Sequence, residues 1–278
     1  MLLVHAHPDD ETITTGGTIA LYRRRGIPVA VVTCTLGEEG EVIGARWAGL
    51  TSAHADQLGG FRIGELTAAL AELGVAEAQF LGGAGRWRDS GMTGTVADPA
   101  PLLPAHPRAF AESGPDAVEE LTRVLLDRRP RVVVGYDPRG GYSHPDHLRA
   151  HRVTMDAVDA AAERGWQVPK VYWTVTDADV LAQHTAALAL RTVDQLPGAL
   201  PPGWTLPVTG ELACVPSASV TTTIDVSDVL AAKRAALRAH GTQVTVAPSG
   251  REFALSNNIA QPVLPEEHYI LARGRPGP

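Results

Sequence analysis

Residues 2–11 read Leu-Leu-Val-His-Ala-His-Pro-Asp-Asp-Glu, an apolar run followed by histidine, proline and three acidic residues. The apolar run predicts a buried strand. Pro8 disfavours helical geometry at His7 and favours a tight turn. A helix is therefore expected to begin among the acidic residues, whose charge suits a helix N-terminus. The stretch predicts a strand, a turn and a helix, with one imidazole and three carboxylates beside the end of the strand.

The same alternation of strand and helix continues through residue 165. Further buried strands are predicted at residues 28–36, 79–81 and 131–136. Helices are predicted at residues 10–25, 45–72 with an interruption at Gly59-Gly60, 118–127 and 148–164. Apolar strands that alternate with helices predict an α/β fold: a Rossmann-like, mostly parallel sheet with helices on both faces. Gly16 and Gly17 within the first helix indicate that another element packs closely against it.

The sequence after residue 165 is less regular. It predicts strands at residues 170–175 and 219–226, and helices at residues 179–190 and 227–239. We expect residues 1–165 to form a Rossmann-like catalytic core. Residues 166–278 are expected to form a smaller C-terminal subdomain that completes the sheet and walls the site. The two parts together are expected to make one structural domain overall.

The composition is that of a globular protein with an acidic surface. Of 278 residues, 44% are hydrophobic and 20% are charged, and the formal net charge is -7. Phosphate binding favours a basic surface, so nucleic acid is not expected as a partner. No apolar run reaches membrane-spanning length, so we expect no membrane association and a cytoplasmic location. Two cysteines give no disulfide framework, and Cys34 is expected to be a reduced, buried thiol.

A second polar stretch follows another predicted strand. Residues 137–147 read Asp-Pro-Arg-Gly-Gly-Tyr-Ser-His-Pro-Asp-His and come directly after the strand at residues 131–136. In an open parallel sheet, ligands bind beyond the carboxyl ends of the strands. Both stretches that contain histidine and aspartate are therefore expected to line the same edge of the sheet. No Gly-x-Gly-x-x-Gly pattern follows the first strand, which argues against a dinucleotide there.

Three residues of these stretches, His7, Asp10 and His147, form a candidate metal site. Two imidazoles and one carboxylate with an open fourth position are typical of catalytic zinc. A zinc-bound water has a pKa of about 7, and Asp9, the carboxylate left over, is the candidate general base. The same ligands also suit Fe²⁺ or Co²⁺. We expect one Zn²⁺ per subunit, with Fe²⁺ as the alternative.

Tyr142, His144 and Asp146 are the candidates for the remaining catalytic tasks. Tyr142 and His144 can donate hydrogen bonds to a developing oxyanion, and His144 can also protonate a departing amine. Asp146 can orient His144. Each polar stretch taken alone has a simpler interpretation, a turn followed by a helix cap, but their occurrence after two strands favours the metal site. His5 and the other histidines are expected to be core or surface residues.

Residues 7–11 and 144–147 together resemble the motifs of the PIG-L/LmbE family of metal-dependent N-deacetylases. The resemblance implies a Rossmann-like fold and hydrolysis of N-acetylglucosaminyl amides. It places the family's metal ligands, general base and oxyanion-assisting side chains on the residues already singled out, namely His7, Asp10, His147, Asp9, Tyr142, His144 and Asp146.

Longer strings resemble those of family members that deacetylate N-acetylglucosaminyl-inositol in mycothiol biosynthesis. These strings are residues 33–44, 82–92 and 253–258. The resemblance implies a small amino-sugar inositol as the substrate, with substrate contacts at Glu41, Arg62 and Asp89. Ionised groups make strong hydrogen bonds to sugar hydroxyls. Surface ion pairs are the simpler interpretation of Glu41 and Arg62.

Two other functions remain open on the sequence alone. A related amidase cleaves mycothiol S-conjugates with the same metal chemistry, but it typically carries a lysine shortly after its first motif, where this chain has Thr12-Ile13-Thr14-Thr15. A non-catalytic sugar- or metal-binding module is the alternative of a different class, and nothing in the sequence indicates decay of the site. The sequence does not give the oligomeric state. Nor does it say whether the polar stretch at residues 82–113 closes over the substrate.

Overall fold

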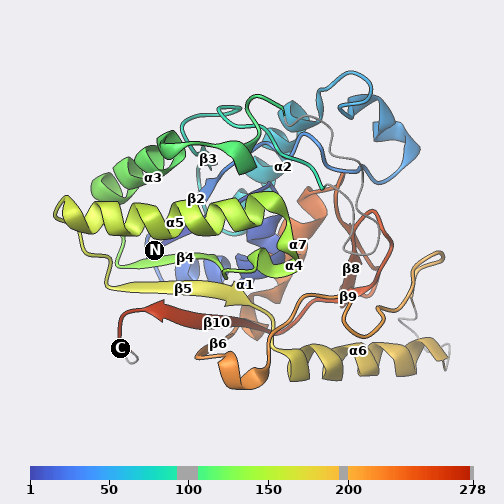
Figure 1. Cartoon of the computed structure of the whole chain (residues 1–278). Coiled ribbons are helices and arrows are strands. Elements are labelled where there is room, and N and C mark those ends of the chain that lie inside the picture. Colours follow the sequence, from blue (N-terminus) through green and yellow to red (C-terminus); the bar gives the residue numbers. More distant parts are fainter. Residues whose placement is uncertain (93–105, 194–199, 276–278) are drawn as a thin grey trace.

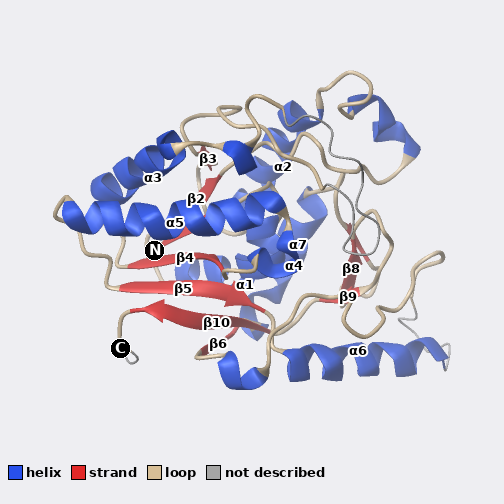
Figure 2. Cartoon of the chain, in the orientation of Figure 1, coloured by secondary structure: helices blue, strands red, loops and turns tan. Residues whose placement is uncertain are grey.

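The computed structural model describes residues 1–92, 106–193 and 200–275. Seven strands of this described chain form one mixed sheet in the order β3-β2-β1-β4-β5-β10-β6 (Figure 1, Figure 2). The first five strands in this order are parallel, and β10 is antiparallel to both of its neighbours. This arrangement confirms the predicted Rossmann-like, mostly parallel sheet. The strands are β1 (Leu2–His5), β2 (Ala30–Thr33), β3 (Gln79–Phe80), β4 (Val132–Tyr136), β5 (Lys170–Val175), β6 (Thr222–Asp225) and β10 (Glu266–Arg273).

Helices cover both faces of the sheet, as the alternating sequence predicts. α3 and α5 lie side by side on one face, and α1, α2 and α7 lie on the other (Figure 1, Figure 2). None of the helices in the described ranges is long and apolar enough to cross a membrane. The helices are α1 (Asp10–Arg24), α2 (Leu58–Glu72), α3 (Pro115–Arg128), α4 (Gly140–Ser143), α5 (Pro145–Glu163), α6 (Ala178–Val193) and α7 (Leu230–Ala239).

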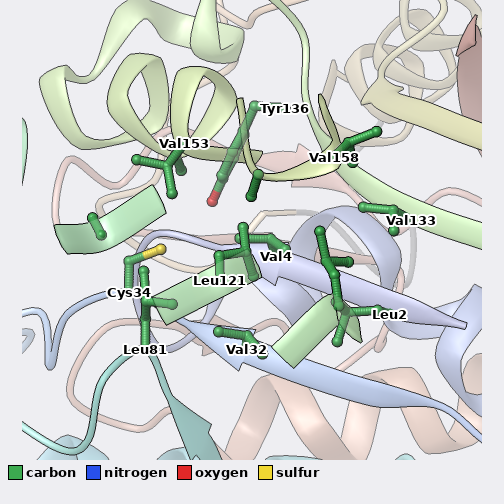
Figure 3. Close-up of a cluster of buried hydrophobic side chains, with 14 of the residues drawn as sticks. Leu2, Val4, Val32, Cys34, Leu81, Leu121, Val133, Tyr136, Val153 and Val158 are labelled. Carbon is green, nitrogen blue, oxygen red and sulfur yellow. The ribbon is translucent and has the colours of Figure 1, made fainter. Parts of the chain in front are cut away.

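The side chains of the central strand β1 alternate between two apolar clusters. Leu2 and Val4 face α3 and α5, where they pack with Cys34 and Leu121 (Figure 3). Leu3 belongs to the cluster on the side of α1, α2 and α7. A strand buried on both faces requires an uninterrupted apolar run, which is what the sequence has here. Cys34 is 2% exposed, which confirms the prediction of a buried thiol.

The order of the strands places a topological switch point between β1 and β4. From β1 the chain continues to β2 and β3 on one side, and then returns to add β4 and β5 on the other. Connections that leave two such strands turn in opposite directions and open a crevice beyond the carboxyl ends. Leu2 and Leu3 pair with Val133 and Val134, so the segments that follow β1 and β4 leave the sheet side by side.

Several predicted helices differ from the structure in their extent. α3 begins at Pro115 and not at residue 118, and residues 227–239 form the 3-10 helix η4 (Ser227–Val229) followed by α7. Residues 45–72 are not one interrupted helix, because the 3-10 helix η1 (Ala45–Leu50) is separate from α2, which contains both glycines in its first turn. A β-carbon at Gly59 would lie 2.6 Å from Cγ of Glu38, so glycine lets α2 pack against the preceding loop. α5 begins at Pro145 and not at residue 148, because proline suits the first turn of a helix and His144 caps it.

The close packing predicted against the first helix is confirmed at Gly17. An added β-carbon there would lie 2.6 Å from Cβ of Val226. The backbone N–H groups of Gly17 and Thr18 donate to the carboxylate of Glu267 on β10, at 2.8 and 2.7 Å. Lys233 of α7 donates to the same carboxylate at 2.6 Å. The C-terminal part of the chain is thus joined to α1 by polar contacts as well as by apolar packing.

The C-terminal part contributes β5, β10 and β6 to the main sheet and also forms a small second sheet. That sheet has the order β7-β8-β9, with bounds Thr245–Val246, Glu252–Ala254 and Gln261–Pro262. The central part of the polar stretch at residues 82–113 lies outside the described residues. Whether this stretch closes over the substrate concerns these same residues outside the described ranges.

Candidate active site

The two polar stretches meet at the switch point. His7 follows β1, while His144 and His147 lie at the start of α5, beyond β4. The ring centroid of His7 lies 4.6 Å from that of His144 and 5.3 Å from that of His147. All three side chains are buried. The segments after β1 and β4 therefore form one shared edge, as expected from a parallel sheet.

Asp10 lies between His7 and His147, the other two predicted metal ligands. Oδ2 of Asp10 lies 3.3 Å from Nδ1 of His7 and 3.3 Å from Nε2 of His147. In a tetrahedral zinc site with ligand distances of about 2.0–2.1 Å, neighbouring ligand atoms are about 3.3–3.4 Å apart. Nε2 of His147 is buried and makes no hydrogen bond to the residues that the structure describes. Such a nitrogen is costly unless a cation binds it, so these residues fit a divalent metal.

Further side chains around His7 also offer ligand atoms. Within the described ranges, two groups of three have ligand atoms within 4.8 Å of one another: His7 with His144 and His147, and His7 with Asp89 and Asp146. His7 belongs to both groups, whereas Asp10 belongs to neither, although it lies 3.3 Å from His7 and from His147. The capacity of this edge to bind a cation is therefore centred on His7.

Tyr136, the last residue of β4, holds the carboxylate of Asp10. Its hydroxyl donates to Oδ2 of Asp10 at 2.7 Å and accepts the backbone N–H of Ala6 at 2.9 Å. Its ring stacks on that of His147, with centroids 4.3 Å apart. Burial alone would raise the pKa of Asp10, but His147 and His7 outweigh it and hold that pKa well below its usual range. Asp10 is thus ionised, as a metal ligand must be.

Asp146 lies against the second ring nitrogen of His7. Its Oδ2 lies 3.1 Å from Nε2 of His7 and accepts the backbone N–H of Ser90 at 2.9 Å. The hydroxyl of Ser90 donates to the other carboxylate oxygen. Burial lowers the pKa of His7, but Asp89, Asp10 and Asp146 outweigh it and raise that pKa well above its usual value. A cation at Nδ1 would replace the proton there, while Asp146 holds the proton on Nε2.

His144 caps the N-terminus of α5. Its Nδ1 accepts the backbone N–H of Asp146 at 3.1 Å, so the neutral ring carries its proton on Nε2. Burial, reinforced by the nearby His7 and His147, lowers the pKa of His144 to about 3. The sequence predicts that the carboxylate of Asp146 orients His144. In the structure the backbone N–H of Asp146 does so, because His7 and Ser90 engage the carboxylate.

Asp9 is held in an uncommon backbone conformation. Its φ of 116° lies in a region that L side chains rarely adopt. Its backbone N–H donates to Oε2 of Glu11 at 2.9 Å, and its carboxylate accepts a hydrogen bond from Arg62 at 3.1 Å. Burial raises the pKa of Asp9 to about 6, against the opposing effect of Arg62. A carboxyl group with a pKa near neutrality suits a general base.

Arg62 of α2 is a buried cation beneath the opening turn. It is 2% exposed, and it donates to the carbonyl oxygen of Gly37 at 2.8 Å and to that of Pro8. Together with the contact to Asp9, these hydrogen bonds engage both terminal nitrogens of the guanidinium. A surface ion pair is therefore excluded as the explanation of Arg62.

The other predicted substrate and catalytic residues lie at different depths. Asp89 is buried, with Oδ1 3.5 Å from Nε2 of His7. Tyr142 is 54% exposed, and its ring centroid lies 4.9 Å from that of His147. Glu41 is exposed and accepts a hydrogen bond from Ser256 at 2.8 Å. The described contacts of Glu41 do not join it to the histidines.

Three residues that hydrogen-bond to the acidic residues of the site were not predicted from the sequence, namely Tyr136, Ser90 and His240. Tyr136 stands directly before the second polar stretch, so its place at the end of a predicted strand is a usable signal. Ser90 follows Asp89 in the polar stretch and has no distinctive pattern. His240 has its Nε2 2.9 Å from Oε1 of Glu11, yet it lies far away along the chain, where no local pattern marks it.

Comparisons with known proteins cover the whole chain. Residues 2–158 match the family model described as "PIG-L: GlcNAc-PI de-N-acetylase". A protein of Nocardia farcinica is 74% identical over 278 residues, which are 100% of this chain and 91% of the relative. A protein of Rhodococcus opacus is 57% identical over 100% of this chain and 92% of the relative. Both are named 1D-myo-inositol 2-acetamido-2-deoxy-alpha-D-glucopyranoside deacetylase.

Two solved structures share the fold at low sequence identity. N,N'-diacetylchitobiose deacetylase from Pyrococcus horikoshii has a TM-score of 0.52 and 19% identity, over 86% of this chain and 68% of that one. The 4-carboxy-2-hydroxymuconate hydratase of Pseudomonas putida has a TM-score of 0.58 and 17% identity, over 100% and 97%. These likenesses concern the fold alone, which a deacetylase and a hydratase share. On the family model and the full-length relatives, this chain belongs to the PIG-L family and is an amide-hydrolysing deacetylase.

Proposed function

We propose that the protein removes the N-acetyl group of N-acetylglucosaminyl-inositol, giving glucosaminyl-inositol and acetate in mycothiol biosynthesis. The observation that carries the proposal is the 74% identity, over the entire chain, to a relative named for this deacetylation. The chemistry of the site supports it, because buried carboxylates beside a cation site suit a substrate that combines an acetamide with many hydroxyls.

His7, Asp10 and His147 would hold one divalent cation per subunit. We favour Zn²⁺, with Fe²⁺ as the alternative, since both accept two imidazoles and a carboxylate. When bound, the cation would polarise the acetamide carbonyl and lower the pKa of water to about 7. The hydrogen bonds of Tyr136 to Asp10 and of Asp146 to His7 support this assignment, because partners of this kind orient metal ligands.

Asp9 would accept the proton of the attacking water. Arg62 fixes its carboxylate, and the raised pKa suits a group that takes up a proton and gives it back. The same proton can then pass to the nitrogen of the departing amine. Amide and water thus become the free amine and acetic acid, and Asp9 returns to its starting state. The acid then gives its proton to the amine, which leaves an ammonium group and acetate. The lowered pKa of His144 favours this route over protonation of the amine by His144.

His144 and Tyr142 would stabilise the carbonyl oxygen as it becomes negative. Nε2 of His144 carries the proton of the neutral ring and is therefore a donor. Tyr142 is 54% exposed, and its ring lies beside that of His147, so its hydroxyl is proposed to reach the substrate there. Donors of this kind lower the barrier because they meet the charge that develops in the transition state. Asp89 and Glu41 are proposed to bind sugar hydroxyls, while Arg62 is assigned to holding Asp9 because its terminal nitrogens are engaged.

The substrate is tested by amine release from N-acetylglucosaminyl-inositol and from a mycothiol S-conjugate. Metal-reconstituted protein and a chelated sample are compared on both compounds. We expect metal-dependent release that favours the small glycoside. Preference for the conjugate would move the assignment to the amidase. Absence of release from both compounds by metal-loaded protein would contradict the proposed substrate and favour a binding module.

A further inference from the structure

The segment that follows α7 packs against the helices around Asp9. α7 lies beside α1 and α2 (Figure 1). His240, the first residue after α7, is fully buried, and its Nε2 lies 2.9 Å from Oε1 of Glu11 in the first turn of α1. The backbone N–H and the hydroxyl of Thr242 donate to Glu65 of α2, each at 2.7 Å. The segment is therefore anchored both to α1, which begins after Asp9, and to α2.

Glu11 connects His240 with Asp9. Oε1 of Glu11 faces His240 and accepts the hydroxyl of Thr12, while Oε2 accepts the backbone N–H of Asp9 at 2.9 Å. Glu11 is fully buried, and the imidazole of His240 is also fully buried. A buried carboxylate left without its partner is strongly unfavourable. His240 therefore stabilises Glu11 in the position from which it binds the backbone of Asp9.

The backbone of Asp9 requires such support. Its φ of 116° and ψ of -34° belong to a sparsely populated region, and a residue stays there only when its surroundings hold it. Arg62 holds the carboxylate of Asp9 and the carbonyl oxygen of Pro8, and Glu11 holds the N–H. A glycine would adopt this conformation without strain, but it would lack the carboxylate.

We propose that His240 is a positioning residue for the deacetylation. Through its hydrogen bond to Glu11 it fixes the backbone of Asp9, and with it the direction of the Asp9 carboxylate. This inference rests on the proposed function, in which Asp9 is the general base. Loss of His240 slows the chemical step, because a misplacement of about 1 Å costs a reaction about a hundredfold. Binding of substrate and metal is nearly unchanged, because His240 touches neither His7 nor Asp10 among the described contacts.

An ordinary structural pair between a buried glutamate and a buried histidine is the competing explanation. In that case a substitution of His240 lowers stability, and turnover falls only with the folded fraction. Glutamine and asparagine at this position separate the two explanations. The amide nitrogen of glutamine reaches the place of Nε2 and can donate to Glu11. The amide of asparagine ends near the place of Nδ1 and cannot.

The test compares His240→Gln and His240→Asn as full-length, metal-loaded proteins acting on N-acetylglucosaminyl-inositol. We expect His240→Asn to lower kcat about 10- to 100-fold, with KM and the zinc dissociation constant within about twofold of wild type. We expect His240→Gln to retain kcat within about threefold. Amide hydrogen exchange over residues 7–12 is expected to be faster in His240→Asn and unchanged in His240→Gln. In the asparagine variant alone, Glu11 loses its partner and moves away from the Asp9 N–H that it accepts in the wild type.

The matched control is His268→Asn, at a buried histidine of β10 whose neighbours are Asp177 and Glu266. It is expected to lower Tm but to keep kcat within about threefold. Equal loss of kcat in His240→Gln and His240→Asn, or wild-type kcat in His240→Asn, would overturn the inference. If His240→Asn does not fold at the assay temperature, both variants are compared at a lower temperature at which they fold, and the same outcomes decide. Absence of turnover in wild type would instead defeat the proposed function.

Discussion

His7 uses both of its ring nitrogens, and this explains why the site is built around it. Nδ1 lies 3.3 Å from Asp10, and Nε2 lies 3.1 Å from Asp146. Because Asp146 holds the proton on Nε2, Nδ1 is the nitrogen at which a cation can replace a proton. Tyr136 orients the carboxylate of Asp10 in a similar way, because its hydroxyl donates a hydrogen bond to Oδ2.

Tyr136→Phe removes the hydroxyl that joins Asp10 to the backbone of Ala6. We expect the affinity for Zn²⁺ to fall about 10-fold or more, because partners of metal ligands typically contribute about 10- to 100-fold. Competition with a chromophoric chelator measures this change. Tyr172→Phe, on the neighbouring strand β5, is the matched control. Unchanged zinc affinity in Tyr136→Phe would contradict the role given to its hydroxyl.

At the residue scale the candidate ligands could be predicted from the sequence, but most of their partners could not. His7, Asp10 and His147 lie in stretches that follow predicted strands, so the parallel sheet brings these stretches to one edge. Ser90 and His240 act through hydrogen bonds between segments that are distant in the chain, and such pairings depend on tertiary packing. The strain at Asp9 likewise has no signature in its amino-acid type.

At the scale of elements, α1 packs closely against the C-terminal part of the chain. Its Gly17 lies against Val226, and its N–H groups at Gly17 and Thr18 bind Glu267. The order of strands and helices could be predicted because buried strands are apolar runs and helices are amphipathic or end at glycine. The limits of α2 and α5 could not, because they depend on the loop at Glu38 and on the cap formed by His144.

Gly17→Ala is expected to destabilise the protein by about 1–3 kcal/mol, because the added methyl group overlaps Val226 and the core must shift. Gly64→Ala in α2 is the control, since nothing lies within 4 Å of its added β-carbon. That substitution should be neutral or stabilising by up to about 1 kcal/mol through helix propensity. Urea unfolding of both variants measures the difference. Equal stabilities of the two variants would show that Val226 does not constrain α1.

Asp177 precedes α6 and provides a pH-dependent contribution to stability. Its carboxylate accepts from the N–H of Asp179 at 2.8 Å and from the hydroxyl of Ser217 at 2.7 Å. Burial raises its pKa, but Ser217 and the backbone N–H groups outweigh it, so the pKa is lowered. A lowered pKa in the folded state gives stability that is present above the unfolded pKa of about 3.9 and is lost as pH falls through the folded pKa.

We therefore expect Asp177→Ala to be about 1 kcal/mol less stable than wild type at pH 7, because a helix cap is lost. The difference between the two proteins should shrink as pH falls below about 4, where the wild-type carboxylate becomes protonated. Denaturant unfolding at several pH values measures it. A difference that stays constant down to pH about 2 would contradict the charge-dependent cap.

For the whole molecule, the segments that carry the proposed metal ligands come from both halves of the parallel sheet. His7 follows β1, and His147 follows β4, which the chain adds on the other side of the switch point. The sequence predicts this edge because local motifs follow both strands. It does not predict that β10 inserts antiparallel between β5 and β6, since that pairing joins segments far apart in the chain.

Removal of the metal is expected to lower Tm by several degrees. A cation at about 100 times its dissociation constant stabilises the folded state by about 2.7 kcal/mol, because it binds the native arrangement of ligands. Thermal unfolding of zinc-loaded and chelated protein measures this shift, and His147→Ala should abolish it. Identical Tm values for loaded and chelated wild type would mean that the cation does not bind the folded site.

The central claim is that a cation held by His7, Asp10 and His147 and a base at Asp9 act together in deacetylation. The most direct test measures amine release from N-acetylglucosaminyl-inositol by wild type and Asp9→Asn, with zinc content determined on the same samples. We predict equal zinc content and a fall in kcat of about 100- to 10,000-fold in Asp9→Asn, the range for loss of a general base. Wild-type turnover by zinc-loaded Asp9→Asn would contradict the account.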